Sequence, residues 1–121
     1  MSTADELDIL TERRGPALIV SLVGSASMEH CEELNERLLD ACLQKPDILV
    51  IDLSRLVFMC SLGLGGLVAA YLRVQKYRGK FAIAAPDAAI KEMLELTRLH
   101  TLLPIFTSAS DAVAHLNRTT E

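Results

Sequence analysis

Seventeen consecutive residues, residues 56–72, carry no charge and lie between Arg55 and Arg73. A run of that length is at the lower limit of about 17 residues for a helix that spans a bilayer. Three glycines and a serine within it lower its hydropathy below that of a typical span. The pattern is typical instead of a buried strand end, a tight turn and a core helix in succession. We therefore expect these residues in the core of a globular domain and not in a membrane.

The size and charge of the chain limit its function further. It has 121 residues, of which 50% are hydrophobic and 23% charged, and this suits one domain with one core. We predict a single domain over residues 1–121 with an ordered core at about residues 6–118. A formal net charge of −4 gives little attraction for the phosphate backbone of a nucleic acid. We expect no nucleic-acid partner.

The cysteines and the N-terminus indicate the compartment. Three cysteines, an odd number in a chain large enough to build a core, fit a reducing environment better than a disulfide framework. The first ten residues carry acids and lack the apolar stretch of a secretory signal. These features predict a cytoplasmic protein.

The hydrophobic pattern predicts an α/β fold in the order ββαβαβαβα. Gly15 and Pro16 mark the turn of an N-terminal antiparallel hairpin, and Ser27 and Asp87 are candidate helix N-caps. Strand-helix units with such short connections require a mostly parallel sheet with helices packed on it. The expected strands are residues 6–13, 17–23, 47–53, 80–85 and 103–106, and the expected helices are residues 28–43, 60–78, 87–98 and a last one from residue 108.

Functional residues of a mostly parallel sheet gather at the C-terminal ends of its strands. In this chain that edge holds residues 24–27 and residues 54–66. Gly63 and Gly65 lack the spacing of a dinucleotide or triphosphate loop, and we interpret them as close contacts between a helix start and the sheet. The cysteines and histidines lack the paired short spacing of a metal site. We expect no cofactor and no metal.

Cys60 is a candidate nucleophile, because the free N–H groups at a helix N-terminus can lower the pKa of a thiol. A thiolate phosphatase would carry an arginine where Gly66 stands, and nothing in the sequence places one of the three histidines beside Cys60 as a base. We interpret Cys31 and Cys42, on one face of a predicted helix, as small buried thiols. We expect no enzyme. A thiol-based redox sensor or enzyme that uses Cys60 is the alternative.

Residues 51–86 resemble the core of STAS domains, in particular that of the anti-sigma factor antagonists. In that family a strand that ends in Asp-Leu-Ser leads through a short apolar loop to Asp-Ser-Ser/Thr-Gly-Leu-Gly at a helix start. Here residues 52–54 are Asp-Leu-Ser, and residues 58–65 are Phe-Met-Cys-Ser-Leu-Gly-Leu-Gly. The resemblance covers essentially the whole chain and implies a fold with the element order given above.

The resemblance also implies a bacterial signalling module in transcription regulation that has no catalytic activity of its own. In such antagonists an anti-sigma factor with serine-kinase activity binds near this helix start and phosphorylates the second hydroxyl residue of the motif. A phosphate adds about −1.5 to −2 charge, which is enough to abolish an interface. The expected partner is therefore an anti-sigma factor of the serine-kinase type. The residues expected at the interface are Ser27, Met59, Cys60, Ser61, Leu62, Gly63 and Leu64.

The chain departs from the family within this motif. Cys60 stands at the aspartate, Ser61 at the first serine and Leu62 at the phosphoacceptor. Leucine cannot be phosphorylated, so we predict a constitutive binder without the usual switch. Ser61 is the alternative acceptor, although it lies about 100° round the helix from the usual position. A third interpretation is that Leu62 and Leu64 bind a small apolar ligand or a second copy of the chain as a homodimer.

Overall fold

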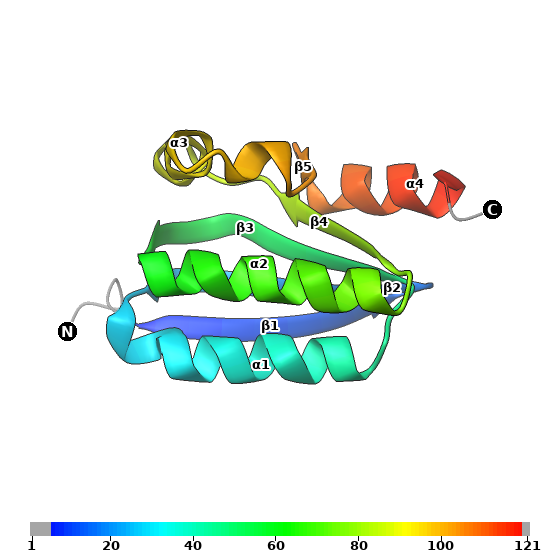
Figure 1. The fold of residues 1–121 in the computed structure, drawn as a ribbon, viewed down its shortest axis with the longest axis horizontal. Coiled ribbons are helices and arrows are strands. Elements are labelled where there is room, and N and C mark those ends of the chain that lie inside the picture. The colour runs from blue at the N-terminus through cyan, green and yellow to red at the C-terminus, as the bar shows by residue number, and fades with distance from the viewer. Residues whose placement is uncertain (1–5, 120–121) are drawn as a thin grey trace.

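A computed structural model describes residues 6–119 of the chain. They form a five-stranded sheet with helices packed on it (Figure 1). The strands are β1 (Leu7–Arg14), β2 (Ala17–Ala26), β3 (Ile48–Met59), β4 (Lys80–Ala84) and β5 (Ile105–Phe106). The helices are α1 (Cys31–Leu43), α2 (Ser61–Lys76), α3 (Ala88–Leu96) and α4 (Ala109–Thr119), with short 3-10 turns at η1 (Met28–His30) and η2 (Leu99–Thr101).

The sheet has the order β1-β2-β3-β4-β5. β1 is antiparallel to β2, whereas β2, β3, β4 and β5 run parallel to one another. The predicted fold class, a mostly parallel sheet with an N-terminal antiparallel hairpin and the order ββαβαβαβα, is confirmed. β5 is shorter than predicted, since only its last two expected residues pair with β4. No helix within residues 6–119 is long and apolar enough to cross a bilayer.

The side chains that alternate along the inner strands build a separate core on each face of the sheet. On β2, Val20 and Leu22 belong to the larger cluster, which also takes in the buried faces of α1, α2 and α3. Ile19 points the other way and packs with Ala112 and Leu116 of α4. Figure 1 shows α1 and α2 side by side over the same face of the sheet. Residues of β2, β3 and β4 contribute to both cores, so these inner strands are covered on both faces.

β3 is longer than predicted, and the expectation of a loop at residues 54–59 is wrong. β4 pairs with β3 only as far as Asp52, but β2 continues along β3 to its last residue. The β2–β3 pairing shifts register twice, once beside Gly24, whose φ of +108° an L side chain rarely adopts. These irregularities break the simple alternation of buried and exposed residues. The sequence pattern therefore hid the second half of the strand.

Helix ends differ from the predictions in local detail. Asp87 caps α3 as predicted, because its Oδ1 accepts from the Ile90 N–H at 2.9 Å. Ser27 occupies the predicted N-cap position, ahead of η1, but its side chain makes no capping hydrogen bond. α2 and α3 each end two residues before the predicted end. Arg78 and Arg98 just beyond them adopt left-handed backbone angles, which stop a helix.

Candidate functional site

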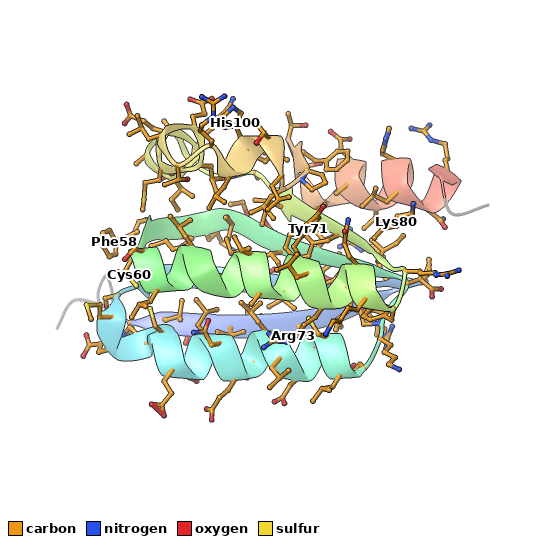
Figure 2. All side chains as sticks on the ribbon, in the orientation of Figure 1. Phe58, Cys60, Tyr71, Arg73, Lys80 and His100 are labelled. Atoms are coloured by element: carbon orange, nitrogen blue, oxygen red, sulfur yellow. The ribbon has the colours of Figure 1, made fainter. Side chains whose placement is uncertain are left out.

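The C-terminal ends of β2 and β3 are neighbours at one edge of the sheet. Ala26 pairs with Met59 at the last position of both strands. The Cys60 N–H then donates to the Ala26 carbonyl at 2.9 Å and extends this pairing by one step. Figure 2 shows Phe58 and Cys60 at this end of α2. The structure thus brings together the two segments, residues 24–27 and 54–66, that the strand order had singled out.

The start of α2 presses against the end of β3. Cys60 occupies the N-cap in an extended conformation, and its carbonyl accepts from the N–H groups of Gly63 and Leu64 at 3.0 and 3.2 Å. A Cβ on Gly63 would lie 2.8 Å from Cγ of Met59, whose side chain is fully buried. Glycine is therefore the residue that lets the first turn of α2 approach the strand this closely.

The predicted interface residues at this helix start divide into an exposed pair and a buried set. Ser61 is exposed, and Leu62 is 53% exposed although it is a large apolar side chain. Met59, Gly63 and Leu64 are buried and belong to the support beneath that pair. A partner that approached this edge would meet the side chains of Ser61 and Leu62 first.

Further apolar side chains are exposed around the same edge. Met28 begins η1, two residues after the end of β2, and Val57 and Phe58 precede the last residue of β3. All three are exposed, as is Leu62. Each comes from a segment that ends or begins at this edge, and exposed apolar side chains that form a patch mark a contact surface. The sequence analysis missed these three residues, although Val57 and Phe58 lie within the uncharged run that it started from.

A groove of about 530 Å³ runs between α1 and α2 and opens beside the helix start. On the α2 side, the groove extends from Ser61 and Leu62 to Arg73. Figure 2 shows Arg73 between α1 and α2. The sequence analysis missed the α1 side of the groove. Its residues recur at helical spacing on the exposed face of the predicted helix, and they are Glu32, Asn35, Glu36 and Leu39. The groove is lined by Glu32, Asn35, Glu36, Leu39, Ser61, Leu62, Gly65, Gly66, Ala69 and Arg73.

Two thiols meet between the helix starts. Sγ of Cys31 lies 2.7 Å from Sγ of Cys60 and 3.3 Å from the carbonyl oxygen of Ser27. Cys31 is buried and Cys60 is partly exposed. Cys42, by contrast, is buried beside the Ala70 carbonyl, as an isolated thiol. Within residues 6–119 no group of three or more His, Cys, Asp and Glu side chains is arranged to hold a metal ion.

Ser27 contributes its backbone to this cluster more than its side chain. Its carbonyl accepts from the Cys31 thiol and, at 3.0 Å, from the His30 N–H. Its Oγ is buried and has no hydrogen-bond partner among the described residues. Ser27 therefore lies at the expected edge of the site, but its hydroxyl oxygen is buried and not exposed at the surface.

Hydrogen bonds give the two thiols different acidities. Burial, together with the hydrogen bond to Cys60 and the charge of a Cys60 thiolate, raises the pKa of Cys31 to about 11. Burial opposes ionisation of Cys60 too, but the Cys31 S–H and the backbone N–H groups of Gly63 and Leu62 outweigh it and lower the pKa of Cys60. Cys60 is thus the sulfur that ionises first. Once Cys60 is a thiolate, it accepts from the Cys31 S–H, which in the neutral pair is directed at the Ser27 carbonyl.

Residues 8–112 match the STAS domain family. The chain belongs to that family. This STAS domain is 26% identical over 112 residues to an anti-sigma F factor antagonist from Paenibacillus polymyxa, a match that covers 91% of the chain and 95% of that protein. The match and the fold make it an anti-sigma factor antagonist-like STAS domain.

Solved structures show the same fold. An anti-sigma factor antagonist from Mycobacterium paratuberculosis superposes with a TM-score of 0.88 at 29% identity, covering 97% of this chain and 99% of that one. The phosphorylated form of the Bacillus cell fate determinant SpoIIAA superposes with a TM-score of 0.70 at 15% identity, covering 89% of this chain and 98% of that one. At that low identity, the second similarity shows the fold alone.

Proposed function

We propose that this domain binds an anti-sigma factor of the serine-kinase type through the start of α2 and the groove beside it, and so frees a sigma factor in the cytoplasm. Two relatives over almost the whole chain bear the name of anti-sigma factor antagonist. The exposed apolar side chains at this edge supply a surface that a partner would cover. The groove between α1 and α2 extends that surface along the helices.

We further propose that the usual phosphorylation switch is absent. The observation that carries this proposal is Leu62, which stands at the family's acceptor position and is 53% exposed there. A kinase that reached this position would find no hydroxyl. Ser61 is exposed as well, but it lies about 100° round the helix from that position. The domain therefore stays in the binding form, and its activity follows its abundance.

The same surface favours binding over catalysis. The side chain exposed at the family's acceptor position is that of Leu62, which is neither an acid, a base nor a nucleophile. Its burial by a partner would favour binding, since apolar area removed from water contributes about 25 cal/mol per Å². A constitutive binding module needs only an apolar contact from this position.

The test compares two leucines on one helix. Leu62 and Leu72 are both 53% exposed on α2, but Leu72 lies ten residues further along, about 15 Å from the helix start. The tagged protein is purified from its own cells, the serine-kinase-type anti-sigma factor is identified by mass spectrometry, and its affinity for purified variants is measured by calorimetry. We expect Leu62→Glu to weaken binding at least tenfold, about 1.4 kcal/mol, and Leu72→Glu to leave it unchanged.

Stability is measured in parallel. Both substitutions are at exposed positions, so each should alter the free energy of unfolding by less than about 0.5 kcal/mol. Equal binding of both variants to the partner would contradict the proposed surface. If no anti-sigma factor co-purifies with the tagged protein, and the protein elutes as a homodimer that Leu62→Glu disrupts, self-association is favoured instead.

A further inference from the structure

Cys31 and Cys60 come from separate parts of the chain to one point in the fold. Cys31 is the first residue of α1, and Cys60 is the N-cap of α2. Because β2 and β3 are parallel neighbours that end together, the helices that follow them start together. The two sulfurs lie 2.7 Å apart, whereas a covalent S–S bond is about 2.05 Å long. They need to approach by less than about 1 Å to bond.

We propose that Cys31 and Cys60 are a redox-sensitive pair that hydrogen peroxide closes into a reversible intramolecular disulfide. The bond would join the start of α1 to the start of α2 and close a loop of residues 31–60. It would lie next to Ser61 and at the end of the α1–α2 groove. The proposal concerns the isolated chain and does not depend on the identity of a partner.

The exposure of the two sulfurs sets the order of the steps. Cys60 is partly exposed and can meet a small oxidant, whereas Cys31 is buried behind it. The Cys60 thiolate attacks one oxygen of the peroxide, so that an S–O bond forms and the O–O bond breaks. The hydroxide that leaves takes up a proton and becomes water. Cys60 is then a sulfenic acid.

The second step uses the neighbouring thiol. Sγ of Cys31 attacks Sγ of Cys60, so that the S–S bond forms and the S–O bond breaks. The hydroxide that leaves takes the proton from Cys31 as a second water molecule. In total two thiols and one peroxide give one disulfide and two waters, with two electrons passing from sulfur to oxygen. A dithiol reductant reverses the change.

The acidities of the two thiols suit these roles. The lowered pKa of Cys60 raises the fraction of the attacking thiolate, and the hydrogen bond from Cys31 keeps the second thiol beside it. The third cysteine lacks both features. Cys42 is buried, its pKa is raised by that burial, and its Sγ lies 3.7 Å from the Ala70 carbonyl oxygen. Cys42 is therefore a matched internal control.

The experiment uses the reduced full-length chain and hydrogen peroxide in small molar excess. The three cysteines fall on different tryptic peptides, residues 15–37, 38–55 and 56–73, so a linked pair is identified without ambiguity. We expect the intact mass to fall by two hydrogens and the peptides of Cys31 and Cys60 to be linked, with Cys42 free. Dithiothreitol should restore the starting mass. Because the closed loop restricts the unfolded chain, Tm should rise by roughly 5–10 °C on oxidation.

Variants separate the role of Cys60, which reacts with peroxide, from that of Cys31, which then attacks Cys60. Cys42→Ser should form the same disulfide as the wild type. Cys31→Ser should stop at a Cys60 sulfenic acid that dimedone traps, and Cys60→Ser should form no linkage. Where a variant fails to fold, the peptide map of the wild type decides alone. A wild type that shows no link between Cys31 and Cys60, or links Cys42 or separate chains instead, would overturn the proposal.

Discussion

Cys60 and Leu62 flank Ser61 at the start of α2, and both differ from the residues of the family motif at their positions. A helix start offers free N–H groups and a partial positive charge, which suit an anion. Cys60 uses that position, because N–H groups of Gly63 and Leu62 help to lower the pKa of its thiol. Leu62 does not use it and instead presents apolar surface. The same turn of helix thus combines an acidic thiol with a side chain that cannot carry a phosphate.

The acidity of Cys60 predicts its reactivity with iodoacetamide. The thiolate is the reacting form, so a lowered pKa moves the half-maximal alkylation rate of Cys60 to a pH below that of an ordinary thiol. Cys42, whose pKa is raised, should react severalfold more slowly at neutral pH. Peptide mass spectrometry over a pH series measures both rates in one sample.

A substitution distinguishes acidity from exposure. Cys31→Ala removes the thiol that is hydrogen-bonded to Cys60 and leaves Cys60 at least as accessible. We expect the half-maximal pH of Cys60 alkylation to move upward in this variant. If the pH profile of Cys60 is the same in both proteins, the hydrogen bond between the thiols does not control its acidity.

At the scale of the elements, the first turn of α2 depends on how closely it approaches β3. Gly63 faces Met59 in the core, whereas a Cβ on Gly65 would meet nothing within 4 Å. The two glycines are two residues apart on one helix and differ mainly in the neighbouring atoms that a Cβ would contact. They allow the packing of the helix start to be tested apart from helix propensity.

We expect Gly63→Ala and Gly65→Ala to have opposite effects. Gly63→Ala forces the buried Met59 side chain to move and should lower the free energy of unfolding by about 1–3 kcal/mol. Gly65→Ala meets no neighbour and should raise it by about 0.5–1 kcal/mol, because alanine is the better helix former. Urea denaturation measures both values. Equal shifts in the two variants would show that α2 does not press on β3 as described.

At the scale of the whole molecule, local signals predicted the order of elements but not all of their lengths. The buried run at residues 48–53 and the capping aspartate Asp87 are read from neighbouring residues, and both predictions are confirmed. The second half of β3 is exposed at Ser54 and Arg55 and pairs with β2 alone, so its sequence resembles a loop. Its strand character depends on a partner more than thirty residues away along the chain.

Only the part of the candidate site that depends on local sequence was predicted. The helix start at Cys60 and the exposed pair of Ser61 and Leu62 follow from local sequence and the family motif. The contact between Cys31 and Cys60 depends on the alignment of Ala26 with Met59, which no local pattern gives. The groove needs α1 and α2 at a fixed separation, so its α1 side was also missed. Two neighbouring parallel strands, each followed by a helix with a cysteine at its start, are the signal that could have suggested the pair.

We propose above that this STAS domain binds its partner without a phosphorylation switch at the usual position. The most direct measurement mixes the wild type, Leu62→Ser and Ser61→Ala with the identified anti-sigma factor and Mg-ATP, and follows the complex and the phosphopeptides together. We expect the wild type and Ser61→Ala to stay bound and unphosphorylated. Leu62→Ser should gain a phosphate at residue 62 and be released, because the added charge of about −1.5 to −2 disrupts the interface. Phosphate on Ser61 of the wild type, with release that Ser61→Ala abolishes, would contradict the account.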